Sequence, residues 1–400
     1  MFRHLLRLTF VSALALWPFM TASADEVTVE ITIANPTDFQ RQELVEIDAD
    51  KVLRLLGVTA DTAMVLQNDL GQELAYQITY DRRLLVDAAV RPKGRWPIYA
   101  RHGRPSAVRP AVYGAQYRQR MDDMAWENDR CAYRVYGPAL QKSGEKSFGI
   151  DVWVKNTPDL IVDQRYRGEF EAVADARRCR QAGDNDGARR ALIAKSIHYD
   201  HGNGMDGYSV GPTLGCGAPA LIDGDTILMP YCYTSYQILD NGPLRFSVRL
   251  DYGANSRGIV EHRIISLDKG SHFNRIRVWY DNVRTPLTLC AGIVKNGQGT
   301  LKTEGHVVAY EDPTDRPKVH GSSVYTAVFF PHHPQAAAAL TPDGRNAVCT
   351  IGGYRGEKVT YYAGAAWSRY DVPDFTVWQH VIRHEMTAIQ QPLRVTISRK

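Results

Sequence analysis

Apolar and polar residues alternate along much of the chain, and this alternation predicts an all-β protein. The first clear run is 26–34, where valine and isoleucine alternate with glutamate and threonine. A period of two places alternate side chains on opposite faces of a strand. A strand at 43–47, a helical turn at 49–56 and a hairpin built from 74–79 and 84–88 follow. We expect residues 25–110 to form an N-terminal β module packed on the main domain.

The second half of the chain consists almost entirely of predicted strands. They are expected at 244–252, 259–267, 275–280, 287–295, 306–310, 324–330, 348–351 and 358–363. Turn residues separate them, as in Asp268-Lys269-Gly270 and Asn296-Gly297. Many strands joined by short turns are typical of a large sandwich or barrel. The predicted fold class is therefore all-β, with a large antiparallel β-sandwich over residues 111–400.

Two interruptions of the strand pattern predict helices. Residues 169–180 and 186–195 are rich in alanine and arginine, and a Gly-Asp-Asn-Asp-Gly break separates them. These residue types favour helix, so we expect a small helical insert around 167–196. A C-terminal helix is predicted at 378–390. Pro392 ends it, and a last strand follows at 393–398.

The N-terminal 24 residues have the pattern of a signal peptide. Arg3 and Arg7 form a basic start, residues 8–20 are largely apolar, and Ala22-Ser23-Ala24 is a small-residue cleavage site. The apolar run is too short for a membrane span. We therefore expect cleavage after Ala24 and a periplasmic or secreted protein.

Composition narrows the choice of partners. The chain is 44% hydrophobic, 10% aromatic and 23% charged, with a net charge of +4 and no long run of like charge. A nucleic-acid groove is therefore not expected, whereas an anionic oligosaccharide or polysaccharide is compatible with the small basic surplus. Six widely spaced cysteines give no metal-site pattern. Their pairing cannot be read from the sequence, although Cys216 and Cys232 could bridge a loop.

The densest group of candidate chemical residues lies at 196–217. It contains His198, His201, Asp206 and Tyr208 among six glycines. Glycine permits positive φ and close approach of the backbone to a ligand, and His and Tyr can move protons. The other interpretation is an irregular loop whose His and Asp side chains cap turns. We favour a site.

A second group of candidates lies at 126–137. Read as one strand, this segment places Asn128, Arg130, Arg134 and Tyr136 on one face. Arginine suits bidentate binding of a carboxylate. A half-exposed strand with salt-bridged arginines explains the same pattern equally well.

Several motifs together resemble a family of exported bacterial proteins, domain-of-unknown-function family 4861. They are Trp126-Glu127-Asn128-Asp129-Arg130, Tyr136-Gly137-Pro138-Ala139-Leu140, Gly149-Ile150-Asp151-Val152-Trp153, Asp206 with Tyr208-Ser209-Val210-Gly211, and Gly292-Ile293-Val294-Lys295. The resemblance covers most of the mature chain. It implies a galactose-mutarotase-like β-supersandwich that binds its ligand on a concave sheet. It also implies carbohydrate-active proteins of polysaccharide-degradation loci that act on uronic-acid oligosaccharides.

A uronic-acid substrate suggests a lyase or oligosaccharide dehydratase working by β-elimination. Such an enzyme must neutralise the carboxylate, remove the adjacent ring hydrogen and protonate the leaving oxygen. We expect His201 or His198 as the base, Tyr208 as the acid and Asp206 as an orienting group. The residues expected to bind substrate are Trp126, Glu127, Asn128, Arg130, Arg134, Tyr136, Asp151, Trp153 and Lys295.

Other interpretations stay open at this point. A non-catalytic carbohydrate-binding protein would use the same surface. A glycoside hydrolase would need paired carboxylates, for which Glu127, Asp129 and Asp151 are candidates. His272 is a further acid–base candidate. No cofactor is expected, since a divalent metal at His198, His201 and Asp206 would lack a compact ligand motif.

Overall fold

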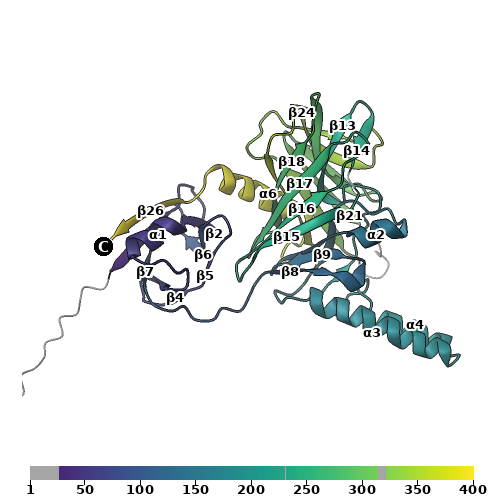
Figure 1. The fold of residues 1–400 in the computed structure, drawn as a ribbon, viewed down its shortest axis with the longest axis horizontal. Helices are drawn as coiled ribbons and strands as arrows, with labels where there is room; N and C mark the ends of the chain where they lie inside the picture. The colour runs from purple at the N-terminus through teal and green to yellow at the C-terminus, as the bar shows by residue number, and fades with distance from the viewer. Residues whose placement is uncertain (1–26, 230, 314–320) are drawn as a thin grey trace, which may run out of the picture.

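The computed structural model describes residues 27–229, 231–313 and 321–400. It contains the N-terminal module, the large antiparallel sandwich, a projecting helical pair and a C-terminal helix (Figure 1). The predicted fold class is confirmed. The predicted signal peptide and its cleavage site lie outside the described residues.

The N-terminal module has two small sheets around its own apolar core. One has the order β26-β1-β7-β3-β4 and the other β2-β6-β5. The strands are β1 (Thr28–Ala34), β2 (Arg41–Asp48), β3 (Met64–Asn68), β4 (Glu73–Leu74), β5 (Tyr76–Ile78), β6 (Arg83–Val90), β7 (Arg95–His102) and β26 (Arg394–Arg399). Helix α1 (Ala49–Leu56) is capped at its N-terminus by Asp48, whose side chain accepts a hydrogen bond from the Lys51 N–H. The last strand of the chain therefore returns to pair with the first. The domain division near residue 110 stays a prediction.

The sandwich is built on an eight-stranded sheet of order β15-β16-β17-β18-β25-β22-β21-β20, which packs against a five-stranded sheet of order β14-β13-β19-β24-β23. The eight strands are β15 (Tyr233–Asn241), β16 (Arg245–Tyr252), β17 (Val260–Asp268), β18 (Phe273–Asp281), β20 (Thr300–Glu304), β21 (Val307–Pro313), β22 (Ser323–Phe329) and β25 (Val359–Trp367). The five are β13 (Cys216–Asp223), β14 (Thr226–Leu228), β19 (Leu287–Val294), β23 (Ala337–Leu340) and β24 (Asn346–Tyr354). Alternation along these strands sends one set of side chains into the core between the sheets. Each fully buried aliphatic side chain there contributes roughly 1.5–3 kcal/mol.

A third five-stranded sheet carries most of the family motifs. Its order is β12-β11-β10-β9-β8, formed by β8 (Tyr113–Tyr117), β9 (Asp123–Glu127), β10 (Cys131–Val135), β11 (Asp151–Val154) and β12 (Met205–Asp206). The expectation of one strand over 126–137 is wrong, because residues 128–130 form the turn between β9 and β10. Asn128 and Arg130 therefore do not share a strand face with Arg134.

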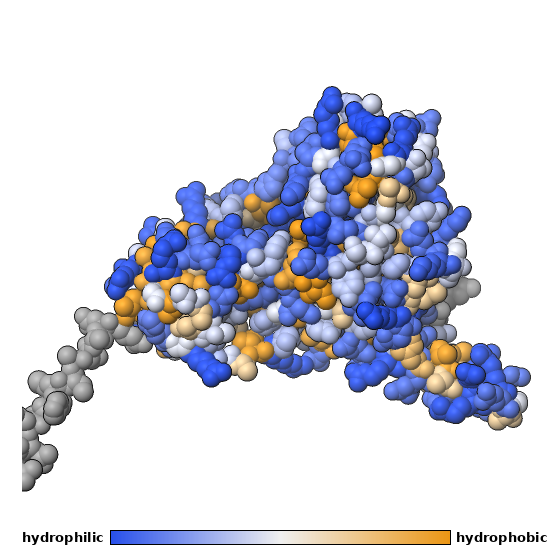
Figure 2. Space-filling view, in the orientation of Figure 1, coloured by the Kyte–Doolittle hydropathy of each residue, from blue (hydrophilic) through white to orange (hydrophobic). Residues whose placement is uncertain are grey.

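The helices lie outside the sandwich. Helices α3 (Val162–Gln181) and α4 (Asn185–Lys195) form the expected insert and project from the body (Figure 1), and a one-turn helix, α2 (Pro138–Ser143), precedes β11. The surface of the projecting pair is mostly hydrophilic, with a smaller apolar area (Figure 2). Helix α6 (Phe375–Gln390) covers part of the outer face of the eight-stranded sheet through Phe375, Trp378 and Ile382.

The structure also bears on the cysteines and on membrane-spanning helices. All six cysteines lie within the described part of the chain, and every one is a free thiol, so the suggested bridge between Cys216 and Cys232 is wrong. Within the described ranges, no helix has the length and apolarity needed to cross a bilayer.

Candidate functional site

The structure brings six of the predicted residues together in a buried ionic cluster. The Arg134 guanidinium on β10 contacts Asp151 on β11, Asp206 on β12 at 3.0 Å and Asp123 on β9 at 3.4 Å. The Arg134 guanidinium also lies over the rings of Tyr136 and Trp153, 5.1 and 5.3 Å from their centroids. His198 joins the cluster through its Nδ1, which lies 3.7 Å from Asp206. Arg134 is 5% exposed and Asp151 is fully buried. In this structure Arg134 therefore binds the protein's own carboxylates.

Charge in this cluster is unbalanced, because three carboxyl groups surround one guanidinium. Burial raises the pKa of Asp151 to about 8 and that of Asp123 to about 6, although Arg134 opposes both shifts. His198 lies at the edge of the cluster, with its ring Nδ1 3.1 Å from the Asp206 carbonyl oxygen and its side chain 43% exposed. Asp151 therefore keeps its proton at neutral pH, whereas Asp123 is mostly ionised.

A pH titration of stability tests this charge imbalance. A carboxyl whose pKa is raised on folding binds more protons in the folded state, so its contribution to stability falls as the pH rises. Asp151→Asn lacks this group and should gain free energy of unfolding relative to wild type between pH 5 and pH 8, by up to about 1.4 kcal/mol per pH unit. Urea unfolding at several pH values measures the difference. Parallel pH profiles for the two proteins would contradict it.

The remaining candidates of the glycine-rich stretch are not gathered at one place. Tyr208 is 4% exposed, and its hydroxyl donates to the Gly215 carbonyl oxygen at 3.0 Å. His201 is exposed, with Nε2 3.1 Å from the Ser196 carbonyl oxygen. Lys295 follows the last residue of β19, outside the cluster. Positive φ at Gly204 and Gly215 brings this backbone against β11, where a Cβ would lie 2.0 Å from the Val154 oxygen and 2.2 Å from the Ile150 oxygen. The glycines serve close backbone packing here.

Another motif residue, Glu127, stabilises the start of α3. Its carboxylate accepts hydrogen bonds from the N–H groups of Ile161 and Val162 at 2.8 Å and pairs with Lys155 at 2.7 Å. A carboxylate at a helix N-terminus satisfies orphan donors and complements the helix dipole. Trp126 is fully buried, with Nε1 donating to Asn274. Both residues act in folding.

The turn between β9 and β10 forms hydrogen bonds with another turn, residues 268–273, which connects β17 to β18. The Asn128 amide donates to the carbonyl oxygens of Asp268 and Ser271 at 2.6 and 2.7 Å, and Asp129 Oδ1 accepts from the Gly270 N–H at 2.7 Å. Gly270 has φ 79°, which favours glycine. The motif therefore fixes the shape of the 268–273 turn.

Arg130 supports the same turn through a partner on the loop before α6. Its Nη1 lies 2.7 Å from Asp371, and Asp371 lies 3.1 Å from His272 Nε2. The Tyr133 hydroxyl donates to the His272 carbonyl oxygen at 2.7 Å. Of the sequence-predicted residues, Asn128, Arg130 and His272 thus meet at this turn.

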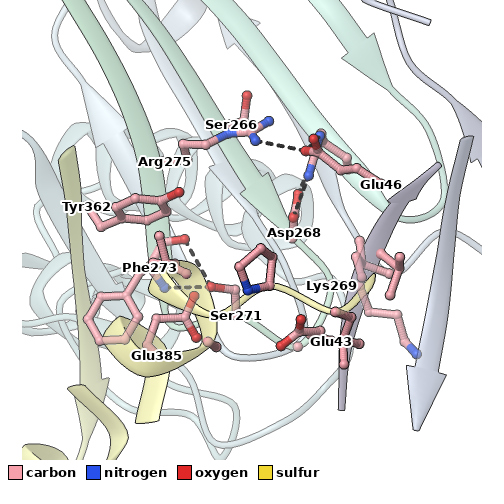
Figure 3. Close-up of a pocket in the computed structure, with 18 of the residues that line it drawn as sticks. Glu43, Glu46, Ser266, Asp268, Lys269, Ser271, Phe273, Arg275, Tyr362 and Glu385 are labelled. Atoms are coloured by element: carbon pink, nitrogen blue, oxygen red, sulfur yellow. Dashed lines mark hydrogen bonds and ion pairs between the residues drawn. The ribbon is translucent and has the colours of Figure 1, made fainter. Parts of the chain in front are cut away.

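The 268–273 turn forms one wall of a groove between the N-terminal module and the sandwich. The cavity has a volume of about 500 Å³, with β2 on one side and α6 on another. Figure 3 shows Glu43 approaching from β2 and Glu385 from α6, with Tyr362 and Arg275 on strands of the eight-stranded sheet. A neighbouring cavity shares Ser271, Phe273 and Glu385 and extends the groove to His272.

Ion pairs join the two walls of the groove. Glu46 Oε1 lies 2.7 Å from Arg245 Nη1 and 2.8 Å from Arg275 Nη1, and Arg245 also binds Asp268 (Figure 3). Burial acts to raise the pKa of Glu46, but Arg275 and Arg245 lower it to about 2. Buried Arg41 binds Glu43 and donates to the Ala388 carbonyl oxygen at the end of α6. These contacts fix β2, α6 and the sheet around one space.

Two groups in the groove are left for a ligand. Among the described residues, neither the Glu385 carboxylate nor the Tyr362 hydroxyl has a hydrogen-bond or ion-pair partner. Burial, with Glu43 and Asp268 nearby, raises the pKa of half-buried Glu385 to about 7. Burial also raises the pKa of Tyr362 to about 12, although nearby Arg275 lowers it. Glu385 can therefore exchange a proton near neutral pH, while Tyr362 stays protonated.

Sequence reasoning did not identify these groove residues. Glu385 lies on a helix that was predicted, and it is the one acidic residue within that helix. A single acidic residue in this helix could have marked Glu385 as a candidate site residue. Glu43, Arg275 and Tyr362 lie in ordinary alternating strands, and only the packing of distant elements brings them together.

The role of the motif turn can be tested without touching the groove. Asp129→Ala removes the acceptor of the Gly270 N–H, and a hydrogen bond to a charged group contributes about 1.5–3 kcal/mol. Exchange of the Gly270 amide with deuterium in the native protein should accelerate at least tenfold. Asp159→Ala, which removes an exposed partner of Arg109, is the matched control. Unchanged exchange at Gly270 would contradict the positioning role.

The family model described as Domain of unknown function (DUF4861) matches residues 33–395. The chain belongs to this family. The resemblance carried by the sequence motifs is thereby confirmed.

A curated relative is also similar. "Uncharacterized protein P7" of Formosa agariphila is 28% identical over 297 residues, which cover 70% of this chain and 68% of the relative.

Among solved structures, an alpha-mannosidase from Enterococcus faecalis aligns at 8% identity and TM-score 0.48, over 93% of this chain and 46% of that one. A glycosyl hydrolase family 38 protein of the same species gives 8% identity and TM-score 0.46, over 93% and 47%. This chain spans about half the length of these solved chains. At these scores the likeness carries no conclusion about activity.

Proposed function

We propose that the protein is an exported carbohydrate-active lyase or dehydratase that acts on a uronic-acid-containing oligosaccharide in the groove between β2, α6 and the 268–273 turn. The observation that carries the proposal is Glu385, an unpartnered carboxyl with a pKa of about 7 that shares this groove with Tyr362. Family membership, and the exported polysaccharide-degrading role that the motifs imply, supports the substrate class.

The groove residues can be assigned to the three requirements of β-elimination. Arg275, which also pairs with Glu46, and Lys269, which also pairs with Asp87, supply the positive charge that neutralises the uronate carboxylate. Neutralisation makes the hydrogen on the adjacent ring carbon acidic. The Glu385 carboxylate removes this hydrogen as a proton, and its bonding electrons form the new carbon–carbon double bond. The carbon–oxygen bond breaks, and the Tyr362 hydroxyl protonates the departing oxygen. Solvent then returns the proton from Glu385 to Tyr362.

A second candidate function is glycoside hydrolysis. Glu43 and Glu385 enter the groove from two different walls, and Glu43 contributes to the raised pKa of Glu385. Burial raises the pKa of Glu43 as well, although Arg41 opposes this shift. Glycosidases use a pair of carboxyl groups of this kind. Glu385 would then be the acid that protonates the glycosidic oxygen.

One assay separates these functions. Purified protein is incubated with uronic-acid oligosaccharides, while ultraviolet absorbance of unsaturated uronates and release of reducing ends are followed together. A rise in absorbance supports elimination, and product mass then distinguishes loss of water from chain cleavage. Reducing ends without absorbance support hydrolysis. Binding without product would identify a carbohydrate-binding protein and overturn both enzymatic proposals.

The same assay tests the assignment of His201 and Tyr208 as base and acid, which stays a prediction. His201→Ala changes an exposed side chain and should leave the fold intact. Loss of turnover in this variant, together with full activity in Glu385→Gln, would move the active site to the glycine-rich loop.

A further inference from the structure

A second polar cavity lies at the base of the helical insert, near the start of α3 and the end of α4. It has a volume of about 630 Å³ and is lined by α3, the end of α4 and the loop after it. Its charged and polar lining includes Arg165, Arg167, Lys195, His201 and Asn203. None of these five residues lines the groove described above.

Arg165 is the buried cation of this cavity, and hydrogen bonds fix its position. It is 5% exposed, and its Nη2 donates to the carbonyl oxygens of Ile197 and Tyr199 at 3.3 and 2.6 Å, as well as to that of Gly204. One guanidinium nitrogen therefore holds the loop in place. Its Nε is buried and has no hydrogen-bond partner within the described chain. An unpartnered donor on a buried cation is costly unless a ligand accepts from it.

The cavity contains an unpartnered acceptor as well. Asn203 Oδ1 is buried and has no partner among the residues that the structure describes. Arg167 and Lys195 add positive charge at the surface. Glu171, paired with Lys195 at 2.6 Å, and the carboxylates of Asp200 and Glu169 near Arg165 offset part of it. A ligand that satisfies the cavity needs an anionic oxygen for the cations and a hydroxyl to donate to Asn203. A bare inorganic anion has no such hydroxyl.

We propose that this cavity is a second, non-catalytic binding site for an acidic saccharide, whose carboxylate or sulfate group meets Arg165, Arg167 and Lys195 while a ring hydroxyl donates to Asn203. An arginine fork binds such oxyanions in a fixed geometry. The site lets the protein hold a long anionic glycan at a point away from the groove. It does not depend on the chemistry proposed for the groove.

The test uses the full chain and hydrogen–deuterium exchange with a galacturonic acid hexasaccharide, maltohexaose or sodium sulfate at equal ionic strength. The acidic hexasaccharide should protect the amides of 196–204 in wild type and in Glu385→Gln. Arg167→Ala combined with Lys195→Ala should weaken this protection at least tenfold in half-saturating concentration. Arg177→Ala, an exposed arginine of the same helix, is the matched control and should change nothing.

Each other outcome is informative. Equal protection by sodium sulfate would identify a site for free inorganic anions and overturn the saccharide proposal, and so would equal protection by maltohexaose. No protection of 196–204 by any ligand would overturn the site. Turnover of a short substrate by the Arg167→Ala, Lys195→Ala variant separates this result from the proposed function, because that activity should persist when only the second site is lost.

Discussion

Glu385→Gln should lower kcat by at least a hundredfold, with little change in KM. Glutamine keeps the size of the side chain but cannot accept the substrate proton, and general base catalysis contributes about 10²- to 10⁴-fold. Turnover is followed by the absorbance of the unsaturated product, and circular dichroism checks the fold. Glu304→Gln, an exposed glutamate on β20, is the control and should retain full activity.

The role of Glu385 as a base also predicts the direction in which kcat/KM changes with pH. A base with a pKa of about 7 gives a kcat/KM that rises as the pH increases through 7 and then levels off. Because the pKa of Tyr362 is about 12, its loss of a proton should not lower the rate below pH 10. A hydrolase that uses Glu385 as its acid would show the opposite pH dependence, with kcat/KM falling above pH 7. Full activity in Glu385→Gln would remove Glu385 from either mechanism.

Arg134→Met should be the most destabilising single substitution in the segment 126–137. It leaves Asp123, Asp151 and Asp206 buried without their cation, and breaking a buried ion pair in this way costs about 3–5 kcal/mol. Urea unfolding at pH 7 measures the loss. Arg178→Met, which removes an exposed pair with Asp175 on α3, should change stability by less than about 0.5 kcal/mol.

The same variant has an expected response to pH and to a second substitution. Its deficit should shrink as the pH falls from 8 to 5, because the remaining carboxyls bind protons in the folded state and need no cation once neutral. Adding Asp151→Asn should recover part of the lost stability. A deficit that is independent of pH and additive with Asp151→Asn would show that Arg134 acts through packing on Tyr136 and Trp153.

The motifs that identify the family do not coincide with the open groove. Glu127 accepts hydrogen bonds from the first N–H groups of α3, and Asn128 fixes the 268–273 turn. Asp151 and Asp206 bind Arg134, which lies between two of the motifs. A sequence shows that arginine, aspartate and tyrosine recur at a spacing suited to a sheet. It does not show whether the partner of an arginine is a substrate carboxylate or an aspartate from the next strand. The two alternatives produce the same local pattern.

The sequence by itself determined many of the elements of this protein, although not the turn at 128–130. Alternation over 26–34, the alanine- and arginine-rich insert and the final helix each depend on contacts within a few residues, so local periodicity was enough to predict them. Tertiary structure decided the site. Glu43 and Glu385 come from opposite ends of the chain and share one groove because β26 returns to β1 and α6 carries the chain across. Burial set the proton affinity of Glu385, and burial is a property of the packed molecule that no single segment of the chain contains.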